Sequence, residues 1–135
     1  MLGKTMTTQR ISKTMFDDLA LKGYDPVAYF AKERAARGSK QFVHDYAGAV
    51  WQFVSASNRD LFVQDPERYM PQYGGYCAWG ISHAKLFDSD PEVWKIINGK
   101  LYLHYNKEIE KAWEQDILSL IVKADAIWFT LGEAG

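Results

Sequence analysis

The sequence predicts an α+β domain, in which antiparallel β-hairpins form a small sheet packed against short helices and a C-terminal amphipathic helix pair. Three observations predict it: two stretches of alternating residues that each reverse at a turn, and a 3–4-residue apolar periodicity near the C-terminus. The 135 residues, 47% apolar and 24% charged, suit one globular domain. We expect a flexible N-terminal segment at residues 1–17 and a single domain at residues 18–130.

The first predicted hairpin turns at residues 47–48, an Ala-Gly pair between two alternating runs. A two-residue turn at this place would put Phe42 opposite Phe53 and His44 opposite Trp51. These aromatic pairs would stabilise the hairpin on one face.

Short helices are predicted after this hairpin. Ser57 is the expected N-cap of the first, which Pro66 would end. The pattern Asp-Pro-Glu-x-aromatic occurs twice, beginning at Asp65 and at Asp90. Each copy predicts a helix start, because Asp caps a helix and Pro fits its first position.

The second hairpin turns at Asn98-Gly99, the dipeptide most typical of a two-residue hairpin loop. This turn pairs Ile96 with Leu101 and Trp94 with Leu103. The pairs give the hairpin one apolar face, and Lys95, Tyr102 and His104 fall on the other.

A helix capped by Asn106 follows the second hairpin. Apolar residues recur every three or four positions in it, at Ile109, Trp113, Ile117, Leu120 or Ile121, Ala124 and Trp128. We expect a break near Asp116, which gives a helix pair that covers the hairpins.

Charge and composition exclude several classes. Sixteen basic and seventeen acidic residues give a net charge of −1, which does not favour nucleic acid. No apolar run reaches the ~20 residues of a membrane span. The N-terminal residues lack the apolar stretch of a secretory leader, which predicts a cytoplasmic protein, or an exported one whose leader was removed.

The first candidate site surrounds the single cysteine, Cys77, in a glycine-rich segment at residues 74–80. Tyr73, Tyr76 and His83 lie near it in the sequence. Three interpretations remain open: a small buried cysteine, a ligand- or metal-binding thiol at the mouth of an aromatic cleft, and a nucleophile. The 8 Tyr, 7 Phe and 5 Trp of the chain favour an aromatic cleft or core.

The second candidate site lies in the turn around Asp25-Pro26. Tyr24 and Tyr29 would point phenols into a pocket, with Asp25 as an acceptor. The alternative is a structural turn in which the carboxylate caps local amides.

Several motifs taken together resemble the YHS domain family, and most closely its stand-alone bacterial members. They are Gly23-Tyr-Asp-Pro-Val-Ala-Tyr-Phe30, Tyr46-Ala-Gly-Ala-Val-Trp-Gln-Phe53, Asn58-Arg-Asp-Leu-Phe62, Asp65-Pro-Glu-Arg-Tyr69, Gly74-Gly-Tyr-Cys-Ala78, Asp90-Pro-Glu-Val-Trp94, Asn98-Gly-Lys-Leu-Tyr-Leu103 and Lys123-Ala-Asp-Ala126. The resemblance covers about residues 18–128.

The resemblance implies a small metal-binding module of the kind found beside copper-transporting ATPases and in some oxygenases. The metal-type members carry cysteines in a D-P-V-C stretch and an F-C-S-x-x-C stretch. This chain has Ala28, Val54 and Asn58 at those positions. The thiolates that select soft metal ions are therefore replaced.

The expected function is a small non-enzymatic binding module. Its ligand would be a small molecule held by Tyr24, Asp25, Tyr29, Tyr73, Tyr76 and Cys77, or a transition metal ion (Cu, Zn or Ni) held by Cys77 and His83. One alternative is a thiol-dependent enzyme or redox protein that uses Cys77. Another is a structural or partner-binding domain, with a homodimer as one form. No phosphate loop or nucleophile elbow is present, so no catalytic residue is named.

Overall fold

The structure is a computed structural model that describes residues 9–133; residues 1–8 of the predicted flexible segment lie outside the described residues. The predicted α+β class is confirmed. The strands are β1 (Ser39–Tyr46), β2 (Ala49–Phe53), β3 (Asp90–Ile97) and β4 (Lys100–His104). The helices are α1 (Ala28–Ala31), α2 (Ala56–Gln64), α3 (Pro66–Tyr69), α4 (Ala78–Ser82), α5 (Lys107–Glu114) and α6 (Ile117–Leu131), with 3-10 turns η2 (Leu21–Gly23) and η3 (Gln72–Gly75).

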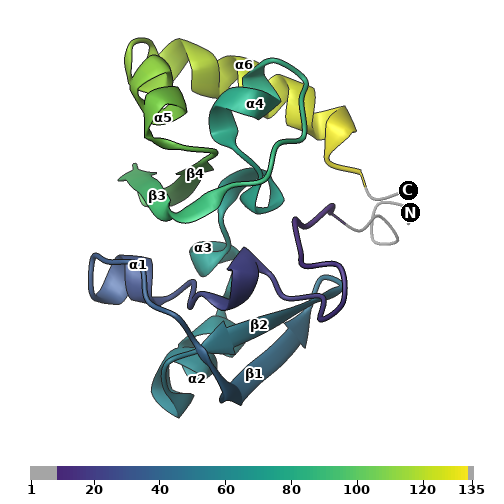
Figure 1. Ribbon diagram of the computed structural model, residues 1–135, viewed down its shortest axis with the longest axis vertical. Helices are drawn as coiled ribbons and strands as arrows, with labels where there is room; N and C mark the ends of the chain where they lie inside the picture. Colours follow the sequence, from purple (N-terminus) through teal and green to yellow (C-terminus); the bar gives the residue numbers. More distant parts are fainter. Residues whose placement is uncertain (1–8, 134–135) are drawn as a thin grey trace.

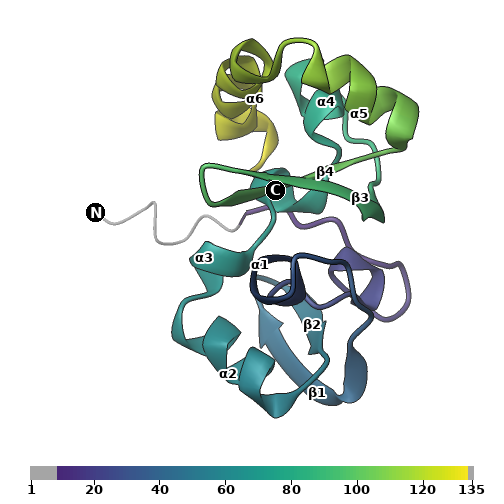
Figure 2. The same ribbon diagram turned by 90° about the vertical axis from the view of Figure 1, so that its left-hand side faces the viewer.

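The two hairpins form separate two-stranded antiparallel sheets within the described residues. Figures 1 and 2 show the β3–β4 hairpin between two groups of elements. Helices α4, α5 and α6 lie on one side of it, and the β1–β2 hairpin with α1 and α2 lies on the other. The chain thus has two hydrophobic cores that share one hairpin.

The first core packs around the β1–β2 hairpin and includes Tyr29, Trp51, Phe53, Phe62, Leu101 and Leu103. The second core lies under α4–α6 and includes Tyr73, Ile81, Tyr102, Trp113 and Ala124. Strand β4 belongs to both, because successive side chains of a strand point to opposite faces. On β4, the face that carries Tyr102 and His104 is therefore as buried as the face that carries Leu101 and Leu103.

The register of the second hairpin is confirmed, with Ile96 opposite Leu101 and Trp94 opposite Leu103. In the first hairpin His44 does pair with Trp51, but the predicted pairing of Phe42 with Phe53 is wrong. Phe53 lies opposite Ser39 instead, across a bulge. Extra residues bulge out of β1 there, so the turn no longer sets the register.

Gly38 explains where the first hairpin departs from regular pairing. A Cβ atom added to this glycine would lie 2.5 Å from the carbonyl carbon of Gln52. The chain therefore approaches β2 more closely at this position than any other residue type allows.

The helix boundaries follow the sequence in part. Asn106 caps α5 by accepting a hydrogen bond from the Ile109 amide at 2.9 Å, and α6 starts after Asp116, as predicted. The N-cap of α2 is Ser55, not Ser57, and accepts from the Asn58 amide.

Of the two Asp-Pro-Glu patterns, only the one at Asp65 begins a helix. The helix predicted after Asp90 is wrong, because this residue begins β3 and pairs with His104. The Pro91 carbonyl is held by a distant hydroxyl, that of Tyr29, at 2.8 Å. Tertiary contacts thus override a local helix signal.

Residues 9–20 connect three parts of the fold. The Arg10 amide donates to the Gly132 carbonyl, the Ser12 amide to the Gly74 carbonyl and the Ala20 amide to the Val50 carbonyl. This segment therefore crosses from the end of α6 to the β1–β2 hairpin (Figure 1).

His104 of β4 is fully buried, and its ring packs on Trp113 with centroids 4.5 Å apart. Neither ring nitrogen has a hydrogen-bond partner among the described residues. Burial lowers the pKa of His104 to about 4, with the Glu114 carboxylate acting in the opposite direction. The imidazole is therefore neutral in the folded protein near neutral pH.

We expect His104 to destabilise the fold as the pH falls from about 6.5 to about 4, because the unfolded chain binds the proton more readily. The loss attributable to this group is at most about 3.5 kcal/mol, since one pKa unit corresponds to about 1.4 kcal/mol. Urea unfolding across that pH range should show a smaller loss for His104→Leu than for the wild type. His83→Asn is the control for losing an exposed imidazole. Equal pH dependence in wild type and His104→Leu would contradict this assignment.

Candidate functional site

The residues predicted as a site lie in separate places. Tyr24, Asp25 and Tyr29 belong to the first core, and Tyr73 belongs to the second. Cys77 immediately precedes α4 and His83 immediately follows it. The structure therefore does not gather these residues around one cavity.

Asp25 is a structural residue with a fully buried carboxylate. Its Oδ1 accepts hydrogen bonds from the Val27 amide (2.7 Å) and the Ala28 amide (3.3 Å). Its Oδ2 accepts from the Val54 amide and from the side-chain amide of Asn58, both at 2.8 Å. This arrangement matches the interpretation of Asp25 as a structural residue that caps local amides. The carboxylate also binds two distant groups, at Val54 and Asn58.

The positions at which the resembled family carries cysteines surround this carboxylate. Ala28, Val54 and Asn58 each donate a hydrogen bond to Asp25. In this chain these three positions therefore supply hydrogen-bond donors to one acid in place of thiols.

The phenols of Tyr24 and Tyr29 are occupied by bonds to β3. The Tyr29 hydroxyl donates to the Pro91 carbonyl and the Tyr24 hydroxyl to the Glu92 carboxylate, both at 2.8 Å. Burial raises the pKa of Tyr29, and the hydrogen bond to Glu92 raises that of Tyr24. Both phenols therefore act as donors that connect the first core to β3.

Cys77 is fully buried, with 0% of its surface exposed. Burial raises the pKa of its thiol, although the backbone amides of Gly80, Tyr105 and Trp79 act in the opposite direction. A reactive thiolate needs exposure and a lowered pKa. The placement of Cys77 therefore favours the buried, structural interpretation over the nucleophile.

The predicted metal ligands lie at opposite ends of α4. His83 is exposed, stacks on Trp79 at 4.0 Å, and places its Nδ1 2.9 Å from the Trp79 carbonyl. Six residues along a helix separate Cys77 from His83 by roughly 9 Å. Across residues 9–133, no three His, Cys, Asp or Glu side chains form a group that could hold a metal ion.

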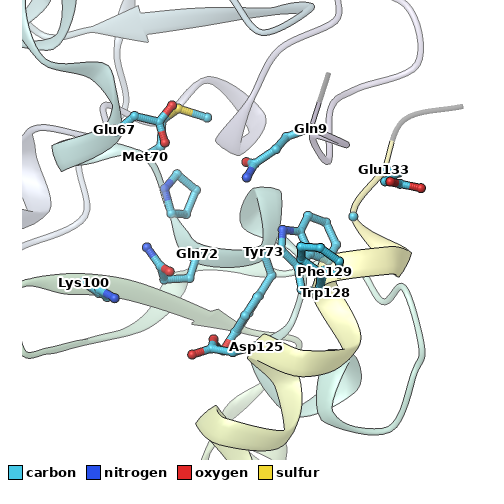
Figure 3. Close-up of a pocket in the computed structure, with 12 residues that line it drawn as sticks. Gln9, Glu67, Met70, Gln72, Tyr73, Lys100, Asp125, Trp128, Phe129 and Glu133 are labelled. Atoms are coloured by element: carbon cyan, nitrogen blue, oxygen red, sulfur yellow. Dashed lines mark hydrogen bonds between the residues drawn. The ribbon is translucent and has the colours of Figure 1, made fainter. Parts of the chain in front are cut away.

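A cleft of about 550 Å³ lies between η3 and the C-terminal half of α6, and we call it the α6 cleft (Figure 3). Its lining includes Gln72, Tyr73, Lys100, Asp125, Trp128 and Phe129. Figure 3 shows Asp125 beside Tyr73, with Trp128 and Phe129 together on α6. Of the residues predicted from sequence, only Tyr73 lines this cleft.

A hydrogen bond of 2.8 Å from the Tyr73 hydroxyl to Asp125 Oδ1 defines the polar side of the α6 cleft. Burial and this bond raise the pKa of Tyr73, so the phenol stays protonated and donates. The Tyr73 ring also packs edge-on against Trp128, with centroids 6.0 Å apart. One tyrosine therefore positions both the carboxylate and the indole.

The aromatic side of the cleft is formed by Trp128 and Phe129. Tyr76 packs on Trp128 at 6.1 Å, and the backbone of Gly132 lies so close to the indole that a Cβ there would overlap it. Phe129 is 85% exposed. An apolar ring this exposed, next to a half-buried indole, is the surface that a ligand or partner would cover.

The sequence predicted α6 only as a helix that covers the hairpins, and it did not identify Asp125 and Phe129 as site residues. One signal was available: Phe129 falls outside the apolar stripe that Trp128 continues, so it cannot pack inward with it. The pairing of Asp125 with Tyr73 had no local signal, because 52 residues separate them.

Comparisons of the chain with family models, curated proteins and solved structures found no match. The resemblance to the YHS domain family therefore stays a prediction from sequence motifs. None of the helices in the described part of the chain is both long enough and apolar enough to cross a membrane.

We expect Asp25→Asn to destabilise the protein by about 3 kcal/mol. Whichever way the new amide turns, its NH₂ group faces two N–H donors: those of Val27 and Ala28, or those of Val54 and Asn58. Urea unfolding measures the change. Asn58→Ala is the control, because it removes one donor and should cost only about 1 kcal/mol. An Asp25→Asn variant as stable as the wild type would refute the structural role.

Cys77 should react with iodoacetamide at least about 100-fold more slowly in the native protein than in concentrated guanidinium chloride, at about pH 8. The reason is that the thiol is buried and its pKa is raised. Mass spectrometry of the alkylated chain over time measures both rates. Similar rates in the two states would restore the interpretation of Cys77 as an accessible, reactive thiol.

Proposed function

We propose that this protein is a binding module that holds a small organic cation with an apolar group in the α6 cleft. The observation that carries the proposal is the Tyr73–Asp125 hydrogen bond beside the Trp128 ring. A carboxylate and an aromatic ring on neighbouring walls are the two groups that attract an ammonium ion from different directions.

The charges around the cleft favour a positive ligand. Glu67, Asp125 and Glu133 contribute carboxylates to its lining, against the single ammonium group of Lys100. The negative potential of several carboxylates around one hollow attracts cations and repels anions. The remaining lining is aromatic and apolar, which suits the body of the ligand.

Tyr73 gives the site a fixed geometry. Its hydroxyl holds one oxygen of Asp125, and the second oxygen stays available to a ligand, because no other hydrogen bond to Asp125 occurs among the described side chains. A carboxylate already oriented by a buried phenol loses less freedom on binding than a mobile one. The volume of about 550 Å³ falls within the usual range for small-molecule sites.

The proposed protein is a binding module, as expected from the sequence, but its ligand site is the α6 cleft and not the surroundings of Cys77. Tyr73 belongs to both versions, and Tyr76 supports the new one by packing on Trp128. The metal site of Cys77 and His83 stays a prediction, without a ligand group around it in the described residues.

The homodimer also stays a prediction. The surface available to a second copy is the outer face of α6, where Leu118 (71% exposed) and Val122 (70%) lie one turn apart. An exposed apolar face of this kind is compatible with a protein partner.

The test is titration of the full chain with benzyltrimethylammonium, followed by isothermal calorimetry, with benzyl alcohol as the neutral probe. Asp125→Asn should weaken binding of the cation about tenfold or more, because it removes the charge and keeps an oxygen for Tyr73. Trp128→Leu should weaken it as well, through loss of the ring face.

Glu110→Gln is the matched control, since it removes one carboxylate from α5 and lies outside the cleft. In the same calorimetric titration at about 0.15 M salt, this variant should change the affinity for benzyltrimethylammonium less than twofold. Equal affinities for the cation and benzyl alcohol, or an unaffected Asp125→Asn variant, would refute the proposed ligand class.

A further inference from the structure

A second cavity, of about 350 Å³, lies where the N-terminal segment crosses the junction of the two cores. We call it the junction cavity. Its lining comes from residues 12–22, from Gly75, from the loop before β3 and the start of β3, and from Leu103 of β4. We propose that the junction cavity binds a small aliphatic monocarboxylate. It shares no lining residue with the α6 cleft, so the inference is independent of the proposed function.

The apolar wall of the junction cavity favours a hydrocarbon chain. Leu19, Leu21, Pro91 and Leu103 line it from three separate segments. Leu103 and Pro91 are buried in the fold, so this wall is rigid. A narrow space among branched aliphatic groups suits a flexible alkyl chain better than a broad aromatic ring.

Ser89 indicates that the ligand also has a polar end. This residue is only 7% exposed and lines the cavity, and its Oγ has no hydrogen-bond partner among the described residues. A buried hydroxyl without a partner is costly, so its presence calls for an explanation. Turning the Ser89 side chain toward the cavity would let an oxygen of a bound ligand supply the missing partner.

Two lysines indicate that this oxygen carries negative charge. Lys13 and Lys22 both line the cavity. Lys13 is engaged by the Gly48 carbonyl at 2.7 Å and by Asp18 at 3.6 Å, whereas the described residues give Lys22 no ion pair. Lys22 therefore contributes a positive charge that no ion pair with a described residue engages.

The backbone at this wall is strained. Leu21 and Lys22 have φ values of 55° and 53°, in the left-handed region that favours glycine. Two consecutive residues of this kind bring an apolar and a charged side chain to one cavity. Strained backbone is often found where a site positions its side chains.

One acid, Asp88, narrows the ligand class. Its carboxylate lines the same cavity and accepts a hydrogen bond of 3.5 Å from the Ser12 hydroxyl. This charge would repel a second negative group on the ligand. A monocarboxylate is therefore favoured over a dicarboxylate of similar length.

The test is a calorimetric titration of the full chain with hexanoate, alongside hexan-1-ol, hexylamine and adipate. Hexanoate should bind at least about tenfold more tightly than each of the other three, because only it combines an alkyl chain with one negative charge. Equal binding of hexan-1-ol would show a purely apolar cavity and would overturn the proposal. Tighter binding of hexylamine, or no binding of hexanoate at millimolar concentration, would also overturn it.

Two variants separate a ligand contact from a structural role. Ser89→Ala should weaken hexanoate binding about tenfold while the melting temperature stays the same or rises, because the change removes a buried group that has no partner. A variant that melts earlier and binds hexanoate normally would assign Ser89 to the fold and refute the contact.

Lys22→Gln should likewise weaken hexanoate binding about tenfold, and raising the salt concentration should reduce the difference from wild type. Lys85→Gln is the matched control, because Lys85 is exposed and does not line the cavity. Equal losses for the two lysine variants would indicate general charge effects and would contradict a local site.

Discussion

The buried carboxylate of Asp25 is the interaction on which the first core depends. It accepts four hydrogen bonds from three segments: the N-terminus of α1, the residue after β2 and the first turn of α2. The Val27 and Ala28 amides would otherwise be buried polar groups without a partner, which costs more than one ordinary hydrogen bond contributes. A single acid therefore determines how the turn, the strand and the helix meet.

The β3–β4 hairpin connects that core to the second one. Leu101 and Leu103 pack into the first core, whereas Tyr102 packs into the second. The Tyr24 and Tyr29 hydroxyls add bonds from the first core to β3. The high aromatic content of the chain follows from this arrangement, because two small cores need large side chains to bury enough surface.

Both cavities lie at the edges of this two-core arrangement, where neither core fills the space. The α6 cleft joins carboxylates and aromatic rings, and the junction cavity joins lysines, an unpartnered hydroxyl and aliphatic groups. Acidic side chains outnumber basic ones in the lining of the α6 cleft, and basic ones outnumber acidic ones in that of the junction cavity. Cys77 lies buried and lines neither of these two cavities, which favours the structural interpretation of this thiol.

The amino-acid sequence by itself determined the α+β class, both hairpin turns, the Asn106 cap and the helix break near Asp116, because these features depend on residues only a few positions apart. Tertiary structure decided the rest. It shifted Phe53 opposite Ser39, placed Asp90 in a strand, gave Asp25 partners 29 and 33 residues away and brought Asp125 to Tyr73. Such contacts arise from packing between distant segments, which leaves no periodic trace in the local sequence.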